Sequence, residues 1–191
     1  MKPVPIVRKL IFAINMTLDG CVDHRKTGYG GEEMLEYYTK LLREADTEIF
    51  GRKTYQLMVP YWPNVAKDPS EDAVSIKFAK TFNALQKVVF SRTLRGVEDK
   101  NTRIVRKNLR AEILKLKQKR GKSILVGGVD LSSQLIKLGL VDEYRLVIVP
   151  VVAGDGKRLM KGIRLPDRKE LKLIDSKAFK SGAIALRYEK Q

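Results

Sequence analysis

The chain has 191 residues, of which 43% are hydrophobic and 31% charged, so its composition suits one folded domain over residues 1–191 and argues against disorder. The longest apolar run near the start, Leu10 to Ile14, is too short for a membrane span or an export signal, which predicts a cytoplasmic protein without a membrane partner. A single cysteine, Cys21, and a single histidine, His24, exclude an internal disulfide and a Cys/His zinc site, so no metal is expected.

Strand-like and helix-like patterns alternate along the chain, which predicts a single α/β domain. Apolar, β-branched runs predict eight strands, at Lys9–Asn15, Thr47–Phe50, Lys87–Phe90, Thr102–Val105, Ser123–Val126, Glu143–Pro150, Glu170–Asp175 and Ala183–Tyr188. Amphipathic stretches predict helices at Glu32–Arg43, Lys53–Val59, Pro69–Asn83, Leu109–Lys119 and Leu131–Leu138, the third with Asp68 as its N-cap. The turn Lys180-Ser181-Gly182 predicts an antiparallel hairpin of the last two strands and therefore a mixed sheet.

The formal net charge of +16 favours an anionic partner. Its densest stretch, Arg103 to Lys122, carries Leu109, Ile113 and Leu116 on one helical stripe and most of its lysines elsewhere, which indicates a solvated helix face. Aromatic residues do not interleave with this run, as they would on a base-stacking surface. We therefore expect no nucleic-acid partner, and keep a basic nucleic-acid-binding domain as an alternative.

A pair of glycines, Gly127-Gly128, separates a short apolar strand from a helix. The pair lets the backbone turn without a Cβ, and the free N–H groups of the following helix point back at it. Asp130 or Ser132 is expected to cap this helix, and Gly139 is expected to end it in the left-handed conformation. Because a helix N-terminus beside bare backbone attracts anions, we expect a bound phosphate here.

Two further strand ends carry similar residues, Gly51-Arg52-Lys53-Thr54 and Ser91-Arg92-Thr93. Glycine permits close backbone approach, hydroxyls donate to phosphate oxygens, and an arginine fork is the usual partner of a ribose 2′-phosphate. Ligands of open parallel sheets bind at the carboxyl ends of strands, so the three segments are expected to line one dinucleotide crevice that prefers NADP to NAD. No G-x-G-x-x-G follows a strand, which excludes the ordinary Rossmann fingerprint.

Four ordered motifs resemble the dihydrofolate reductase-like superfamily: Met16-Thr17-Leu18-Asp19-Gly20, Gly51-Arg52-Lys53-Thr54-Tyr55, Ser91-Arg92-Thr93 and Val126-Gly127-Gly128. Over almost its whole length the chain is most similar to the reductase domain at the C-terminus of bifunctional riboflavin-biosynthesis deaminase-reductases. The resemblance implies a three-layer α/β fold, with an eight-stranded mixed sheet, helices on both faces and an antiparallel C-terminal hairpin. It also implies NADPH across the strand ends, a homodimer, and a Gly127–Gly128 peptide bond that can be cis.

The resemblance also implies roles for individual residues. Ala13 and Asn15 would lie beside the nicotinamide, and the Asp19-Gly20 loop would close over it. The cofactor's ribose and phosphate groups would be held by Gly51, Arg52, Lys53, Thr54, Ser91, Arg92, Thr93, Gly127, Gly128, Val129, Asp130 and Leu131, with Ser91 and Arg92 at the 2′-phosphate.

The catalytic carboxylate is left open between two positions. Asp19 is a candidate because a carboxylate on a glycine-flanked loop can swing over the site, although Asp19-Gly20 is also typical of a plain turn. Glu32, Glu33 and Glu36 lie where dihydrofolate reductases place a carboxylate. We take Glu36 as the second candidate, since the other two already complement the helix dipole.

The expected function is therefore an NADPH-dependent reductase, similar to 5-amino-6-(5-phosphoribosylamino)uracil reductase, acting on a pyrimidine or pterin-like heterocycle. A dihydrofolate reductase-like pterin reductase and a family member without catalysis are alternatives. The chain has no zinc-deaminase signature, so any role in riboflavin synthesis would be reduction alone. Tyr55, Tyr61 and Trp62 either wall a substrate pocket or pack at a helix end, and the Gly154–Lys157 segment either closes a pocket or is a plain loop.

Overall fold

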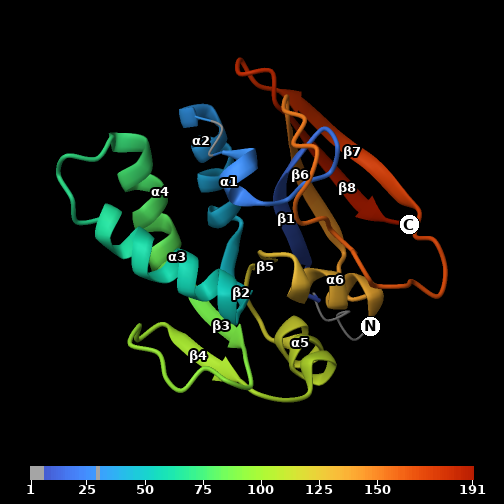
Figure 1. Cartoon of the computed structure of the whole chain (residues 1–191). Coiled ribbons are helices and arrows are strands. Elements are labelled where there is room, and N and C mark those ends of the chain that lie inside the picture. The colour runs from blue at the N-terminus through green and yellow to red at the C-terminus, as the bar shows by residue number, and fades with distance from the viewer. Residues whose placement is uncertain (1–6, 29–30) are drawn as a thin grey trace, which may run out of the picture.

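An eight-stranded mixed sheet runs through the computed structural model, which describes residues 7–28 and 31–191 (Figure 1). Its strands are β1 (Leu10–Thr17), β2 (Ala45–Gly51), β3 (Gln86–Phe90), β4 (Thr102–Val105), β5 (Ser123–Val126), β6 (Glu143–Val149), β7 (Leu171–Ala178) and β8 (Ile184–Lys190). They lie in the order β4-β3-β2-β5-β1-β6-β8-β7, with parallel pairing from β4 to β6. Strand β8 is antiparallel to both β6 and β7, which confirms the predicted C-terminal hairpin.

Helices cover both faces of the sheet, as predicted. They are α1 (His24–Thr27), α2 (Gly31–Arg43), α3 (Arg52–Val65), α4 (Ala73–Ala84), α5 (Leu109–Gln118) and α6 (Asp130–Lys137). Figure 1 shows α2, α3 and α4 on one side of the sheet and α5 and α6 on the other. Neighbouring residues of β2 join the two cores, since Phe50 packs with Phe82 beneath the first group and Ile49 packs with Ile113 beneath the second. A parallel sheet buried on both faces leaves its strand ends as the place for a site.

Helix α3 is longer than predicted. It continues beyond the expected end at Val59 to Val65 and contains Pro60 and Pro63. Tyr55, Val59 and Trp62 are buried along one helical face. This packing outweighs the backbone hydrogen bonds that the prolines cannot donate.

Helix α4 begins later than predicted, and Asp68 is not its cap. The carboxylate of Asp72 accepts hydrogen bonds from the backbone N–H of Ser75 at 2.8 Å and from its hydroxyl at 2.6 Å. Asp68 instead accepts from the backbone N–H of Ser70 at 2.9 Å, in the preceding turn. Both aspartates are of a residue type that caps helices, and Asp72 is the one bonded to the first turn of α4.

The basic stretch over α5 is less solvated than predicted. The apolar stripe is confirmed, because Ile113 and Leu116 are buried against the sheet. Lys117, however, is also buried, and its Nζ lies 2.5 Å from a carboxylate oxygen of Asp142. Arg103, at the start of the stretch, pairs with Glu112. Part of this positive charge is therefore neutralised within the fold.

Among the helices formed by the described residues, none has the length and apolar character needed to cross a membrane.

Candidate functional site

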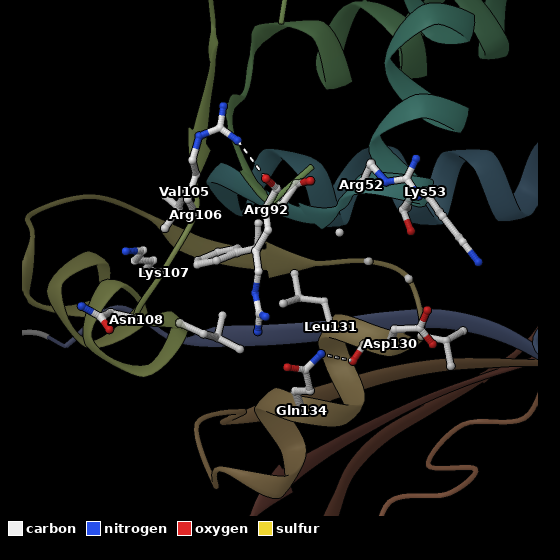
Figure 2. A pocket seen from close by; sticks show the side chains of 18 of the residues that line it. Arg52, Lys53, Arg92, Val105, Arg106, Lys107, Asn108, Asp130, Leu131 and Gln134 are labelled. Atoms are coloured by element: carbon white, nitrogen blue, oxygen red, sulfur yellow. Dashed lines mark hydrogen bonds between the residues drawn. The ribbon is translucent and has the colours of Figure 1, made fainter. Parts of the chain in front are cut away.

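A cavity of about 840 Å³ opens at the carboxyl ends of β2, β3, β4 and β5. The loops after these four strands form its walls, so the predicted convergence of strand ends is present in the fold (Figure 2). The lining residues are Gly51, Arg52, Lys53, Thr54, Phe90, Ser91, Arg92, Val105, Arg106, Lys107, Asn108, Leu109, Gly127, Gly128, Val129, Asp130, Leu131, Gln134 and Lys157.

Three helices begin at the cavity wall, α3 at Arg52, α5 at Leu109 and α6 at Asp130. In the described part of the chain, none of these three helices has a capping side chain bonded to its first turn. By contrast, α1 and α4 are capped by Asp23 and Asp72. The free N–H groups and the positive dipole ends of three helices therefore face one cavity, an arrangement that binds anions.

The expected cap of α6 is wrong. Val129 occupies the N-cap position and Asp130 is the first helical residue. Ser132 is buried within the helix, and its hydroxyl has no hydrogen-bond partner among residues 7–28 and 31–191. Gly139 does follow the helix with a φ of 68°, as predicted. Without a cap, the first N–H groups of α6 remain available to a ligand.

Positive side chains dominate the cavity. Six cationic residues line it, Arg52, Lys53, Arg92, Arg106, Lys107 and Lys157, against one carboxylate, that of Asp130. Asp130 is 2.7 Å from Lys157 Nζ. Within the described chain, Arg52, Lys53 and Arg92 have no carboxylate partner. The cavity therefore has a large excess of positive charge that no acidic side chain balances.

Close backbone contacts shape the floor of the cavity. Gly128 has a φ of 82°, and a Cβ there would collide with Thr54 Oγ1. Gly51 lies against Leu131 across the same floor. The peptide bonds of the described residues are all trans, so the expected cis bond between Gly127 and Gly128 is wrong. The left-handed conformation of Gly128 makes the turn instead.

The turn after β3 carries the central cation of the cavity. The Ser91 hydroxyl oxygen accepts from the backbone N–H of Thr93 at 3.2 Å and of Leu94 at 2.9 Å, so its own proton is free to donate. Arg106 donates to the backbone carbonyl of Arg92 at 3.3 Å and steadies this turn. Figure 2 shows the Arg92 side chain running from the turn toward the α6 end that carries Leu131. Thr93 is exposed and is not part of the cavity lining.

The residues expected beside the nicotinamide lie one strand away from the cavity. Phe12 of β1 pairs with Val126 of β5, so Ala13 follows at the level of Gly127. Asn15, further along β1, accepts a hydrogen bond at Oδ1 from the hydroxyl of Tyr38 on α2. Ala13 and Asn15 therefore lie in β1, on the sheet face that α2 covers. The residues predicted to hold phosphate lie at the carboxyl ends of β2, β3 and β5, on the opposite side of β1 from β6.

Asp19 fastens two loops together. Its carboxylate accepts hydrogen bonds from the backbone N–H of Ala153 at 3.0 Å and of Gly154 at 2.9 Å, and from the Thr17 hydroxyl at 2.5 Å. Arg158 lies 3.4 Å away. The backbone hydrogen bond from Ala153 contributes most to holding the pKa of this carboxyl well below its usual range. A carboxylate so fully bonded is suited to anchoring the loop after β6.

The acidic residues of α2 divide into engaged and exposed groups. Glu33 accepts a hydrogen bond from the backbone N–H of Lys180 at 2.8 Å and lies 3.4 Å from Lys177 Nζ, which ties α2 to the β7–β8 turn. Glu32 and Glu36 are both exposed to solvent. Of the three, Glu33 therefore has a clear structural role.

The aromatic cluster of α3 is mainly packing. Tyr55 and Trp62 are buried in the core beneath α3 and α4, and the exposed ring of Tyr61 meets Trp62 edge-on, with ring centroids 4.9 Å apart. The Gly154–Lys157 segment, by contrast, does reach the cavity, through Lys157. The backbone carbonyl of Lys157 accepts from the N–H of Val22 at 2.7 Å, which docks this segment on the loop after β1.

Sequence reasoning missed the fourth strand end. Arg106, Lys107 and Asn108 follow β4 and lead into α5. A predicted strand and a predicted helix flank them, so the argument that found the other three strand ends applies here as well. Lys157 and Gln134 also line the cavity. Lys157 belongs to the Gly154–Lys157 segment, for which the sequence leaves a pocket-closing role open, whereas no sequence pattern singles out Gln134, within α6.

The RibD C-terminal domain model matches residues 8–185. The chain belongs to the RibD C-terminal domain family. Its relatives include the Bacillus subtilis (strain 168) "uncharacterized protein YyaP", which is 35% identical over 188 residues that make up 95% of this chain and 94% of YyaP.

Solved structures show the fold of this RibD C-terminal domain protein. A putative riboflavin biosynthesis protein from Shewanella sp. PV-4 superposes with a TM-score of 0.70 at 17% identity, over 96% of this chain and 99% of that one. The Thermotoga maritima diaminohydroxyphosphoribosylaminopyrimidine deaminase/5-amino-6-(5-phosphoribosylamino)uracil reductase superposes with a TM-score of 0.67 at 14% identity, over 97% of this chain and 57% of that one. These similarities confirm the dihydrofolate reductase-like fold.

Proposed function

We propose that this protein is an NADPH-dependent reductase that transfers a hydride to a pyrimidine or pterin-like heterocycle. One observation carries the proposal: three uncapped helix N-termini and six cationic side chains converge on a cavity at the carboxyl ends of four strands. Membership of the RibD C-terminal domain family supports reduction as the chemistry. Cytoplasmic location and a homodimer stay predictions.

The cavity residues fit the phosphates of such a cofactor. The backbone N–H groups that open α3 and α6, with Thr54 and the bare turn at Gly128, suit a pyrophosphate. The guanidinium of Arg92, which has no carboxylate partner among residues 7–28 and 31–191, and the hydroxyl of Ser91 suit a 2′-phosphate. NADPH, when bound, would supply the hydride, and the protein would orient it and exclude water.

The protein's own contribution at the reacting end would come from β1 and α2. Ala13, at the level of Gly127, leaves room for a flat ring, and the Asn15–Tyr38 hydrogen bond fixes the polar groups beside it. We assign Asp19 to holding the loop after β6, because all of its hydrogen bonds run to that loop or to its own turn. Glu36 remains our candidate for a proton-carrying group.

An Arg92→Ala variant tests the cofactor assignment. If Arg92 contacts the 2′-phosphate, the variant should lose about tenfold or more in affinity for NADPH, the size of a charge-assisted hydrogen bond, and little in affinity for NADH. Lys115→Ala, which removes a cation from α5 outside the cavity lining, is the matched control. Equal weakening of NADPH and NADH binding would refute the role of Arg92.

A turnover screen tests the reaction itself. NADPH oxidation, followed by absorbance, should be stimulated by at least one ribosylaminopyrimidine, pterin or dihydrofolate substrate. Tight NADPH binding without turnover on any of them would favour the family member without catalysis. The nucleic-acid alternative has less support, because Lys117 and Arg103 in the basic stretch are already paired with Asp142 and Glu112.

A further inference from the structure

A buried carboxyl group, that of Glu48, lies behind the glycine turn of the cavity. Glu48 is in β2, where it pairs with Leu125 of β5 and with Lys87 of β3. Its Oε1 atom is 3.7 Å from the position that a Cβ on Gly127 would take. Gly127 itself lines the cavity, so Glu48 is separated from the cavity by this turn.

The Glu48 carboxyl is buried, and one of its oxygens has no hydrogen-bond partner in the part of the chain that the structure describes. Only 8% of the residue is exposed. Its Oε2 atom is fully buried, and within the described chain it accepts and donates no hydrogen bond. A buried polar atom of this kind carries the cost of a hydrogen bond that is never made. An apolar side chain at this position would avoid that cost.

The nearest cation does not neutralise Glu48. Lys87 is the neighbour across the β2–β3 pair, and its Nζ is 3.3 Å from Asp99 Oδ2. The same ammonium donates to the backbone carbonyl of Leu85 at 3.2 Å and lies over the ring of Phe82. The Lys87 ammonium is thus engaged with Asp99 after β3 and with Leu85 and Phe82 before it, and it acts on Glu48 only through its electrostatic field.

Burial determines the protonation state of this group. Desolvation raises the pKa of Glu48 to about 8, and Lys87 opposes the shift only in part. On β5, the residues that face Glu48 are Leu125 and Gly127, neither of which titrates. Near pH 7 the side chain is therefore mainly the neutral acid.

We propose that Glu48 is a positioning residue of the cavity, which supports phosphate binding at the Gly127–Gly128 turn while it is neutral and weakens that binding when it ionises. The inference rests on the proposed function, since it assumes that a phosphate binds at this turn. An ionised Glu48 would place a negative charge in a region of low dielectric directly behind that turn. The cavity would then lose affinity for phosphate in mildly alkaline solution because Glu48, in β2, has become negatively charged.

Calorimetric titration with inorganic pyrophosphate between pH 6 and pH 9.5 tests the proposal on the full chain and its Glu48→Gln variant. Taking the ratio of their affinities cancels the titration of pyrophosphate and of the cavity lysines. The ratio should be near one at pH 6 and should reach about tenfold in favour of Glu48→Gln above pH 9, as expected for one charge at short range.

A second variant separates this effect from simple packing. Glu48→Leu should bind pyrophosphate with the same weak dependence on pH as Glu48→Gln, whereas a purely structural role predicts an affinity loss that does not change with pH. Parallel pH profiles for the three proteins would overturn the role of Glu48 and leave the phosphate cavity intact. No pyrophosphate binding at any pH in any of them would overturn the cavity assignment, and this inference with it.

Discussion

The two ends of the parallel sheet differ in whether their charged side chains form ion pairs within the described residues. At the amino ends of β1 and β6, the buried carboxylate of Glu143 is surrounded by Arg145, Arg187 at 3.0 Å and Lys9 at 3.5 Å, so each charge has a partner within the fold. At the carboxyl ends, cations such as Arg52 and Arg92 have no carboxylate partner among the described residues. Removing one member of a buried ion pair destabilises a fold, whereas cations that have no partner among the described residues and face free helix ends are suited to an external anion.

The largest expected effect is the loss of the internally paired acid. Glu143→Gln would leave Arg145 and Arg187 without their buried partner, so we expect a loss of about 3–5 kcal/mol in the free energy of unfolding, measured by urea denaturation. Asp130→Asn, which removes the exposed acid of the cavity, should change it by less than about 1 kcal/mol. Similar losses of unfolding free energy in the two variants would show that the paired charges at the amino ends matter no more for stability than the exposed acid of the cavity.

A second prediction concerns the pH dependence of stability. The pKa of Glu48 is raised to about 8 in the folded chain, so between the usual carboxyl range and pH 8 the unfolded chain loses a proton that the folded chain keeps. The free energy of unfolding should therefore fall with rising pH in this window, by up to about 1.4 kcal/mol per pH unit. Urea denaturation of Glu48→Gln should lack this slope. Equal slopes in the two proteins would show that Glu48 is charged throughout.

A third prediction compares two glycines that both have a positive φ, of which only one has neighbouring atoms where a Cβ would be placed. Gly128→Ala would place a Cβ against Thr54, whereas Gly28→Ala, also at positive φ, would meet no atom within 4 Å in the described residues. Both variants should lose about 1 kcal/mol from backbone strain, and Gly128→Ala about 1–3 kcal/mol more from the collision. Only Gly128→Ala should lose pyrophosphate affinity. Unchanged pyrophosphate binding by Gly128→Ala would place the phosphate elsewhere.

The smallest effect is expected at the loop anchor. Asp19→Asn weakens the acceptor of the Ala153 and Gly154 amides, so these amides should exchange hydrogen several-fold faster. Because the pKa of Asp19 is lowered by folding, the native chain should lose the same protection as the pH falls through this lowered pKa, and keep it above the usual carboxyl range. If amide exchange stayed unchanged while NADPH turnover disappeared, Asp19 would be catalytic after all.

The sequence predicts the sheet and much of the site because both depend on local patterns. The strand ends at Gly51, Ser91 and Gly127 are visible as small or hydroxyl residues that follow apolar runs. The role of Asp19 depends on Ala153, which is distant in sequence, and no local pattern indicates that contact. The unpaired state of Glu48 likewise depends on Lys87 being engaged elsewhere.

The boundary errors have a similar origin. Pro60 ends a helix by local rules, but the buried face of α3 extends past it. Asp68 and Asp72 are equivalent caps by residue type, and the structure places Asp72 at the start of α4 and Asp68 in the turn before it. Tertiary contacts decide where local preferences conflict.

The most direct test of the central claim is a calorimetric titration of the unmodified protein with NADPH and with NADH, at low and at moderate salt. We predict saturable binding of one NADPH per chain, tighter than NADH and weakened by salt, as expected for phosphates held by cationic side chains. Absence of binding by either nucleotide at low salt would contradict it.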